Sequence, residues 1–198
     1  MKRNILFLLA TLGIAGCNSG GTVTVNTPTC YAPTFTAQTA ATLLNNWGNG
    51  LIQYNAQNNS NVFLSAGYFT MTYYYLDATL QPTLNAVQRT GINPIYDYFA
   101  TSFLPKNPIM SIPNSESNIA YSLDCGYGGY VGYYDFKTYP GTDHETITHA
   151  RFTFVYVYIP QPFVSSFIAE SGPTVGQSYS QNNNPGWYIL VQHSSILP

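Results

Sequence analysis

The chain has 198 residues and a formal net charge of −2 at pH 7, and only 7% of its residues are charged whereas 16% are aromatic. Six lysines and arginines leave no basic surface, so the composition argues against a nucleic-acid partner. Because charges are so few, solubility depends on Asn, Gln, Ser, Thr and the 18 tyrosines, which favours a β-rich exported protein.

The N-terminus has the layout of a bacterial lipoprotein signal. A basic start precedes an apolar run at 5–14, which is too short to span a bilayer, and Ala-Gly-Cys follows. We therefore expect residues 1–16 to be a signal peptide and Cys17 to carry the lipid; the alternative is an ordinary signal peptide with a chance cysteine. The expected location is the bacterial cell envelope. Asn18 is not the aspartate that signals inner-membrane retention, which favours the outer membrane.

The next segment predicts a tether followed by one domain. Residues 17–35 are rich in Gly, Ser, Thr, Asn and Pro and predict a flexible tether. The length of 36–198 is typical of a single domain. A helix is expected to begin near Thr36, because apolar residues recur there at steps of three and four: Ala40, Leu43, Leu44, Trp47, Leu51 and Ile52.

The following elements are shorter. Ser60 is expected to cap a second short helix through 62–64, and the aromatic segment 71–76 predicts a strand. Asn93 as cap, with Pro94 at the first helical position, predicts a third helix.

The rest of the chain predicts strands, at 118–123, 130–137, 146–158 and 187–195, with a long insertion at 160–185. Segment 146–158 is apolar on both faces, which indicates a central, covered strand. Helices followed by strands favour an α+β domain in which a curved antiparallel sheet wraps the helices. A cone of this kind leaves an apolar cavity, a usual place for a ligand.

Two cysteines remain after Cys17. In an oxidising compartment Cys30 and Cys125 are expected to form a disulfide, and the alternative is two buried free cysteines. Their spacing matches no zinc motif, and we expect no metal and no cofactor.

The C-terminal third carries a recognisable pattern. Residues 150–156 read A-R-F-T-F-V-Y; then come Gly186-Trp187, His193-Ser194-Ser195 and a terminal proline. This pattern resembles the calcium/calmodulin-dependent protein kinase II association-domain family, in its bacterial SgcJ/EcaC-type branch of the NTF2-like superfamily. Segments 95–99 and 132–136 also fit the family's order.

The chain departs from the family pattern in three places. Gln192 stands where the family usually has the first histidine of a pair. Gly186 directly precedes Trp187, whereas the family pattern has one residue between its glycine and its tryptophan. The insertion 160–185 replaces a tight hairpin. The resemblance implies an NTF2-like α+β cone that self-associates through its sheet, usually as a dimer. It implies no kinase activity, because the chain lacks the glycine-rich loop, HRD and DFG motifs. No basic amphipathic stretch is present for calmodulin.

Few residues are candidates for chemistry. Arg151 is either an anion clamp in the cavity or one half of an ion pair with Asp97 or Asp77. His193 is either a general acid/base or a structural side chain at the cavity floor. The aromatic candidates for the cavity or the dimer face are Tyr98, Tyr134, Tyr156 and Trp187, and the alternative is that they form core.

Three hypotheses of function follow. The leading one is a membrane-tethered homodimer that binds a small apolar or carboxylate ligand, or a protein partner, without catalysis. The first alternative is an isomerase, cyclase or dehydratase that uses His193 with Asp97 or Asp77 and orients its substrate with Arg151. The second alternative is a pure oligomerisation module, which a cavity filled by the protein's own side chains would favour.

Overall fold

The computed structural model describes residues 30–83, 87–170 and 172–197. The predicted signal peptide at 1–16, the lipidated Cys17 and most of the tether at 17–35 lie outside the described residues. None of the helices in the described ranges is long and apolar enough to cross a membrane.

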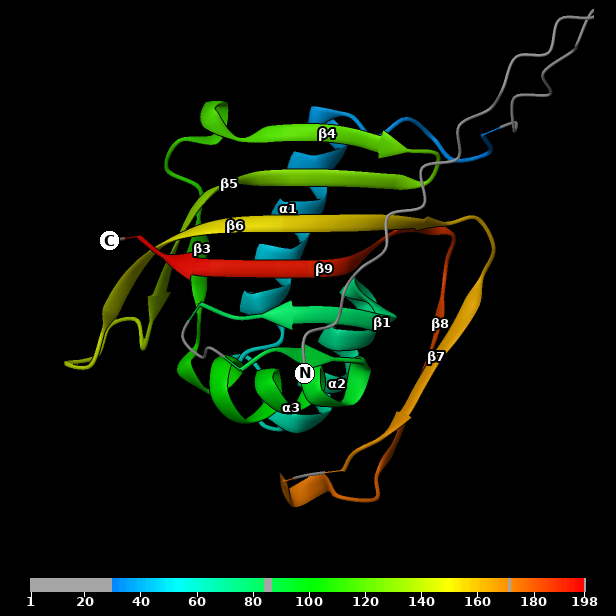
Figure 1. The fold of residues 1–198 in the computed structure, drawn as a ribbon. Helices are drawn as coiled ribbons and strands as arrows, with labels where there is room; N and C mark the ends of the chain where they lie inside the picture. The colour runs from blue at the N-terminus through cyan, green and yellow to red at the C-terminus, as the bar shows by residue number, and fades with distance from the viewer. Residues whose placement is uncertain (1–29, 84–86, 171, 198) are drawn as a thin grey trace, which may run out of the picture.

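One curved sheet covers one side of three helices (Figure 1). Its strand order is β2-β1-β9-β6-β5-β3, and β4 also pairs with β5. Only β1 and β9 run parallel to each other; the other pairs are antiparallel. The expected α+β cone is confirmed. The strands are β1 (Tyr74–Gln81), β2 (Arg89–Thr90), β3 (Ile109–Ser111), β4 (Ile119–Asp124), β5 (Tyr127–Thr138), β6 (Thr146–Ile159) and β9 (Gly186–Ile196).

Helix α1 (Ala37–Gln53) lies behind the sheet and follows the sequence expectation. The Thr36 hydroxyl accepts a hydrogen bond from the Thr39 backbone N–H at 3.1 Å, which caps the helix. Of the expected apolar residues, Ala40, Leu44, Trp47 and Leu51 are buried, whereas Leu43 is half-buried and Ile52 is exposed. Trp47 is at the centre of the buried face, 5.6 Å from Phe154 of β6 between ring centroids.

Two helix expectations are wrong in their bounds. Helix α2 (Val62–Tyr73) is capped by Asn61, not Ser60, and continues through much of the predicted strand at 71–76. Helix α3 (Ile92–Tyr98) begins after Gly91, so Asn93 is not its cap. In α2 the cause is burial around most of its circumference, since packing on several sides removes the periodicity that marks a surface helix. A π-turn (Phe99–Phe103) and a 3-10 turn (Leu104–Lys106) continue α3.

Strand β6 is central, between β5 and β9, as predicted. Phe152 and Phe154 point inward and are buried, whereas Arg151 on the opposite face is exposed. The expectation that both faces are covered is therefore wrong for the single chain: helices cover one face and leave the other open.

The insertion at 160–185 forms a two-stranded hairpin that extends from β6 and β9 along the helices (Figure 1, orange). Its strands are β7 (Phe163–Ile168) and β8 (Ser178–Asn183). Tyr179 packs on α2 so closely that a Cβ at Gly67 would lie 2.5 Å from the ring. The hairpin is therefore part of the packed body rather than a loose loop.

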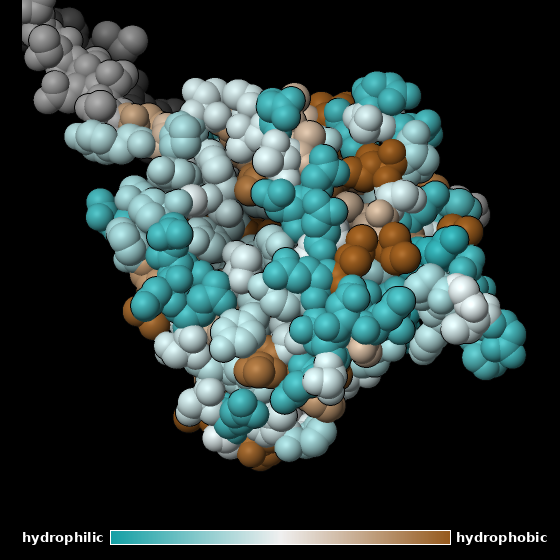
Figure 2. All heavy atoms as spheres, turned by 180° about the vertical axis from the view of Figure 1, so that it is seen from behind, coloured by the Kyte–Doolittle hydropathy of each residue, from teal (hydrophilic) through white to brown (hydrophobic). Residues whose placement is uncertain are grey.

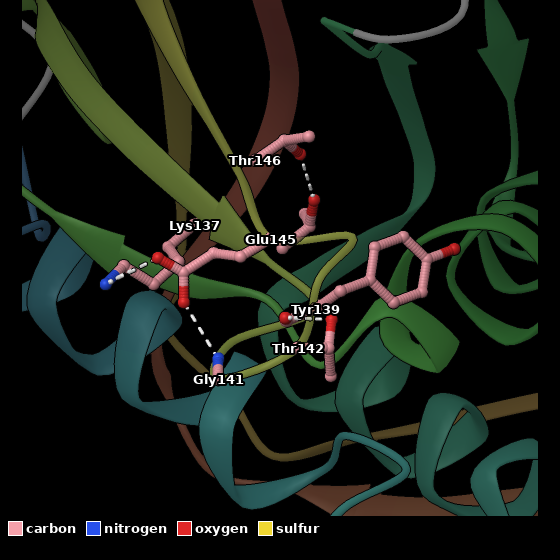
Figure 3. A network of polar contacts seen from close by, with 7 residues as sticks. Lys137, Tyr139, Gly141, Thr142, Glu145 and Thr146 are labelled. Atoms are coloured by element: carbon pink, nitrogen blue, oxygen red, sulfur yellow. Dashed lines mark hydrogen bonds and ion pairs between the residues drawn. The ribbon is translucent and has the colours of Figure 1, made fainter.

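Two local links fix the ends of β5. The disulfide between Cys30 and Cys125 is present, as predicted, and ties the segment before α1 to the β4–β5 turn. At the other end, the β5–β6 turn is held by Glu145, which accepts from the Gly141 backbone N–H at 2.8 Å and pairs with Lys137 at 3.2 Å (Figure 3). The Gly141 hydrogen bond, with Lys137 second, lowers the pKa of Glu145.

Candidate ligand site in the cone

A small cavity lies between the inner face of the sheet and the helices. Its free space is about 10 Å³, which is about one water molecule. The protein's own side chains fill the rest of the cone, so the cavity has no room for an apolar ligand of ordinary size. For a ligand of that size, this arrangement favours the pure oligomerisation module over the leading hypothesis. The lining residues are Trp47, Leu80, Pro82, Thr83, Tyr98, Phe99, Phe103, Tyr134, Phe136, Gln192 and Ser194.

Three hydroxyl groups meet at one point of this cavity. Tyr134 projects inward from β5 and donates to Ser194 Oγ of β9 at 2.5 Å. The Thr83 hydroxyl, which follows β1, is hydrogen-bonded to the same Ser194 oxygen. Chain segments far apart in sequence thus place three hydroxyl groups, each able to donate or accept, together in a cavity lined mostly by aromatic side chains.

A second polar chain runs through the cavity wall. Trp47 Nε1 donates to the Tyr74 hydroxyl at 3.2 Å, and Tyr74 donates to the Gln192 side-chain oxygen. All three residues are buried. Gln192 therefore supplies a neutral amide where the resembled family has a histidine.

The tyrosines of this site are neutral at physiological pH. Burial raises the pKa of Tyr134 to about 12, although its hydrogen bond to Ser194 and the neighbouring polar groups of Thr83 and Gln192 partly oppose the shift. Burial also raises the pKa of Tyr74 and of Tyr98 well above the usual value. The Arg89 guanidinium lies 4.9 Å from the centre of the Tyr98 ring, so a positive charge is held against one wall of the cavity.

Some expected site residues line the cavity and others do not. Tyr98 and Tyr134 line it, as predicted. Trp187 faces the same side of the sheet but packs against Phe35 and Tyr158, at 5.0 and 5.3 Å between ring centroids, away from the lining.

Arg151 and His193 lie on the outer face of the sheet, which corrects their expected place in the cavity. In β9 a bulge near Ile189 shifts the alternation, so that Gln192 faces inward and His193 faces outward beside Thr153. Arg151 is opposite Ser195 on the same outer face, and it is exposed.

The expected partners of these two residues are also elsewhere. Arg151 forms no ion pair with any described residue, and Asp77 is exposed on β1. Asp97 is half-buried on α3 and does not line the cavity. The acid/base pair of the enzyme hypothesis is therefore not assembled. His149 instead pairs with Asp135 at 2.7 Å on the outer face, and the described residues contain no group of three metal ligands.

Sequence reasoning missed Thr83, Gln192 and Ser194 as cavity residues, and it missed Tyr74, which is hydrogen-bonded to Gln192 but does not line the cavity. Gln192 and Ser194 stand on either side of His193 in the strand. If the alternation of inward and outward side chains had been counted from Ser194 rather than from Trp187, both residues would have been predicted to face the cavity. Thr83 lies in a loop and carries no sequence signal.

The open face of the sheet is apolar over four strands. Ile119 and Tyr121 of β4 are 51% and 46% exposed, and Tyr133 of β5 is 39% exposed. The opposite side is mostly hydrophilic, with separate hydrophobic spots (Figure 2). We define the outer sheet face as Ile119, Tyr121, Leu123, Val131, Tyr133, Arg151, Thr153, Val155, Val157, Val191 and His193.

Comparison with known proteins places the fold. No protein-family model and no curated protein matches the chain. A solved structure from Xanthomonas campestris, assigned as a calcium/calmodulin-dependent protein kinase II association domain, is 23% identical over 82% of this chain and 89% of its own, with a TM-score of 0.55. This likeness shows the fold, which is the expected NTF2-like cone.

Two further structures match at lower TM-scores. An NTF2-like superfamily protein from Salmonella enterica is 13% identical over 80% of this chain and 94% of its own, with a TM-score of 0.48. An iota-carbonic anhydrase from a cyanobacterium, complexed with bicarbonate, is 13% identical over 88% and 99%, with a TM-score of 0.49.

Proposed function

We propose that the protein is a membrane-tethered, self-associating module that binds a small oxyanion of the carboxylate type, such as formate or bicarbonate, inside its cone. The observation that carries this proposal is the meeting of the Thr83, Tyr134 and Ser194 hydroxyls in a cavity lined mostly by aromatic side chains. Hydroxyls that meet at one point can each donate to a ligand that accepts several hydrogen bonds.

The size of the cavity decides between ligand classes. A free space of about 10 Å³ excludes the larger apolar ligand considered from sequence. A ligand of three or four heavy atoms can enter by separating the three hydroxyls. The oxygens of such a ligand replace the hydrogen bonds that Tyr134 and Thr83 make with Ser194.

The charge of the site favours an anion. The lining contains no carboxylate, and its tyrosines stay protonated and able to donate because burial raises their pKa values. Arg89 adds a positive charge behind Tyr98. Hydrogen bonds to an ionised acceptor are stronger than neutral ones, so a carboxylate gains more here than water does.

The same chemistry favours binding over turnover. A general base must be able to take a proton near the working pH. Neither a histidine nor a carboxylate lines the cavity, and Tyr134, with its pKa raised to about 12, is a poor proton acceptor at neutral pH.

Self-association and tethering rest on other observations. The outer sheet face is a broad apolar surface, and such surfaces mark interfaces. A two-fold dimer would cover it with a second copy of itself. The disulfide supports an exported protein, and lipidation at Cys17 would provide the tether.

Calorimetric titration with a size series of anions tests the proposal. The protein is the chain from residue 17 with Cys17→Ser, which keeps every described residue. Formate and bicarbonate should bind, acetate more weakly, and benzoate not at all. Ser194→Ala should weaken formate binding by about 5-fold through the loss of one hydrogen bond. Ser195→Ala, on the outer face one residue away, should leave it unchanged.

Two outcomes would contradict the proposal. Benzoate binding as tight as that of formate would mean that the cavity opens widely and selects for apolar bulk. Equal losses in Ser194→Ala and Ser195→Ala would place the site elsewhere. Stopped-flow CO2 hydration adds a check on the non-catalytic part: a rate above buffer that disappears in Tyr134→Phe would show turnover.

A further inference from the structure

A second concave site lies on the helical side of the molecule, between α1 and the segment that follows β3. Its volume is about 310 Å³, at the low end of the range for ligand pockets. It shares no lining residue with the cavity in the cone, and its wall α1 lies on the side of the sheet opposite to the outer sheet face (Figure 1).

Polar side chains line both walls of this groove. Asn45 and Asn49 are four residues apart on α1, so they stand on the same face of the helix. Ser111 and Ser115 form the opposite wall. None of these four side chains makes a hydrogen bond to a described residue, so two amides and two hydroxyls face the groove with their hydrogen-bonding capacity unused by the protein.

The floor of the groove is apolar. Met110 packs against α1 at Gly48, where a Cβ would lie 2.3 Å from the methionine methyl group. Ile112 lies beside it. Gly48 therefore allows the thioether to approach the helix backbone and to form a hydrophobic strip between the two polar walls.

The local sequence of α1 disagrees with its helical state at this place. Asparagine is a weak helix former, costing roughly 0.5 kcal/mol relative to alanine at each position. Asn45 and Asn49 are exposed, and neither side chain makes a hydrogen bond to a described residue that offsets this cost. Asn46 is exposed on the same helix but does not line the groove, so it is the matched control for these two asparagines.

The groove contains no charged lining residue, which restricts its ligand. An anion would need a positive charge beside the groove, of the kind that Arg89 places behind Tyr98 at the cavity in the cone, and a metal ion would need carboxylates. Amides and hydroxyls both donate and accept, as do the hydroxyls of a sugar, and the apolar strip suits the C–H face of a pyranose ring. We propose that this groove binds a neutral saccharide, of one or two pyranose units.

NMR titration of the chain from residue 17 with Cys17→Ser tests this inference. The probes are glucose, N-acetylglucosamine and chitobiose, with triglycine as a neutral peptide. At least one sugar should shift the side-chain amide signals of Asn45 and Asn49 saturably, with a Kd of about 1 mM for a few hydrogen bonds. Asn49→Ala should weaken binding by about 5-fold. Asn46→Ala, exposed on the same helix outside the groove, should not.

The variants are expected to fold, because alanine is the better helix former, and their thermal midpoints check this. Loss of sugar binding in Asn49→Ala with an unchanged midpoint supports the saccharide site. An absence of saturable shifts with all three sugars overturns it. Binding of triglycine without sugars, or an equal loss in Asn46→Ala, overturns it as well.

Discussion

Gln192 sets the polarity of the cavity in the cone. It accepts from Tyr74, which in turn accepts from Trp47, so one buried amide orients two large side chains. A histidine at this position would bring a titratable group into the lining. With glutamine the wall stays neutral at every physiological pH. An anion in the cavity therefore meets hydrogen-bond donors and no titratable group at this position.

Removal of the Tyr74 hydroxyl tests how far the fold depends on the hydrogen bonds that link Trp47, Tyr74 and Gln192. In Tyr74→Phe the Trp47 N–H and the Gln192 carbonyl lose their buried partner, and each unsatisfied group costs roughly 1–3 kcal/mol. We expect urea denaturation to show a loss of about 2 kcal/mol in the free energy of unfolding. Tyr73→Phe is the control, because its half-buried hydroxyl bonds only the Asn46 carbonyl and should cost less. Equal losses would contradict the assigned network.

The buried tyrosines also predict alkaline unfolding. Their folded pKa values lie above the unfolded value near 10, so they stabilise the fold fully below pH 10. As pH rises towards 12 the unfolded state loses these protons first and stability falls. The shift for Tyr134, fully buried, corresponds to roughly 3 kcal/mol. Circular dichroism with absorbance at 295 nm should show one transition between pH 10 and 12. Ionisation of all tyrosines near pH 10 without unfolding would contradict this.

At the scale of elements, the hairpin β7–β8 depends on α2. Gly67→Ala improves helix propensity by about 1 kcal/mol, but the new methyl group meets the buried Tyr179 ring. Overpacking costs about 1–3 kcal/mol, so we expect a net loss in thermal stability. In a Tyr179→Leu background, which removes the ring, the same change should become neutral or stabilising. A stabilising effect of Gly67→Ala in the wild-type background would show that the hairpin does not pack here.

The elements that the sequence predicted well are those with a clear period or a cap. Helix α1 follows its three- and four-residue spacing from Thr36, and β6 follows its alternation. Helix α2 was misjudged in part because Thr72 and the tyrosines at 73–75 favour strands locally, whereas tertiary burial keeps 71–73 helical. The candidate site was misjudged at His193 because a single bulge in β9 reverses which face each later side chain takes.

At the scale of the whole molecule, the outer sheet face predicts a dimer. Val155 lies near its centre on β6, and lysine there would place a charge in an apolar interface. We expect sedimentation velocity to show a dimer for the wild-type chain and a monomer for Val155→Lys. Val164→Lys, at a valine 56% exposed on the hairpin, is the control and should remain a dimer. A wild-type monomer at micromolar concentration would refute self-association through this face.

The position of the small anion tests the account most directly. Nuclear Overhauser effects between the formate proton and the protein's ring protons report which side chains surround the bound ligand. We predict contacts to Tyr134, Tyr98 and Phe136, which line the cavity, and none to Tyr133 on the outer face. Contacts to Tyr133, or an absence of contacts to Tyr134 at saturating formate, would show that the hydroxyl cluster is only part of the packed core.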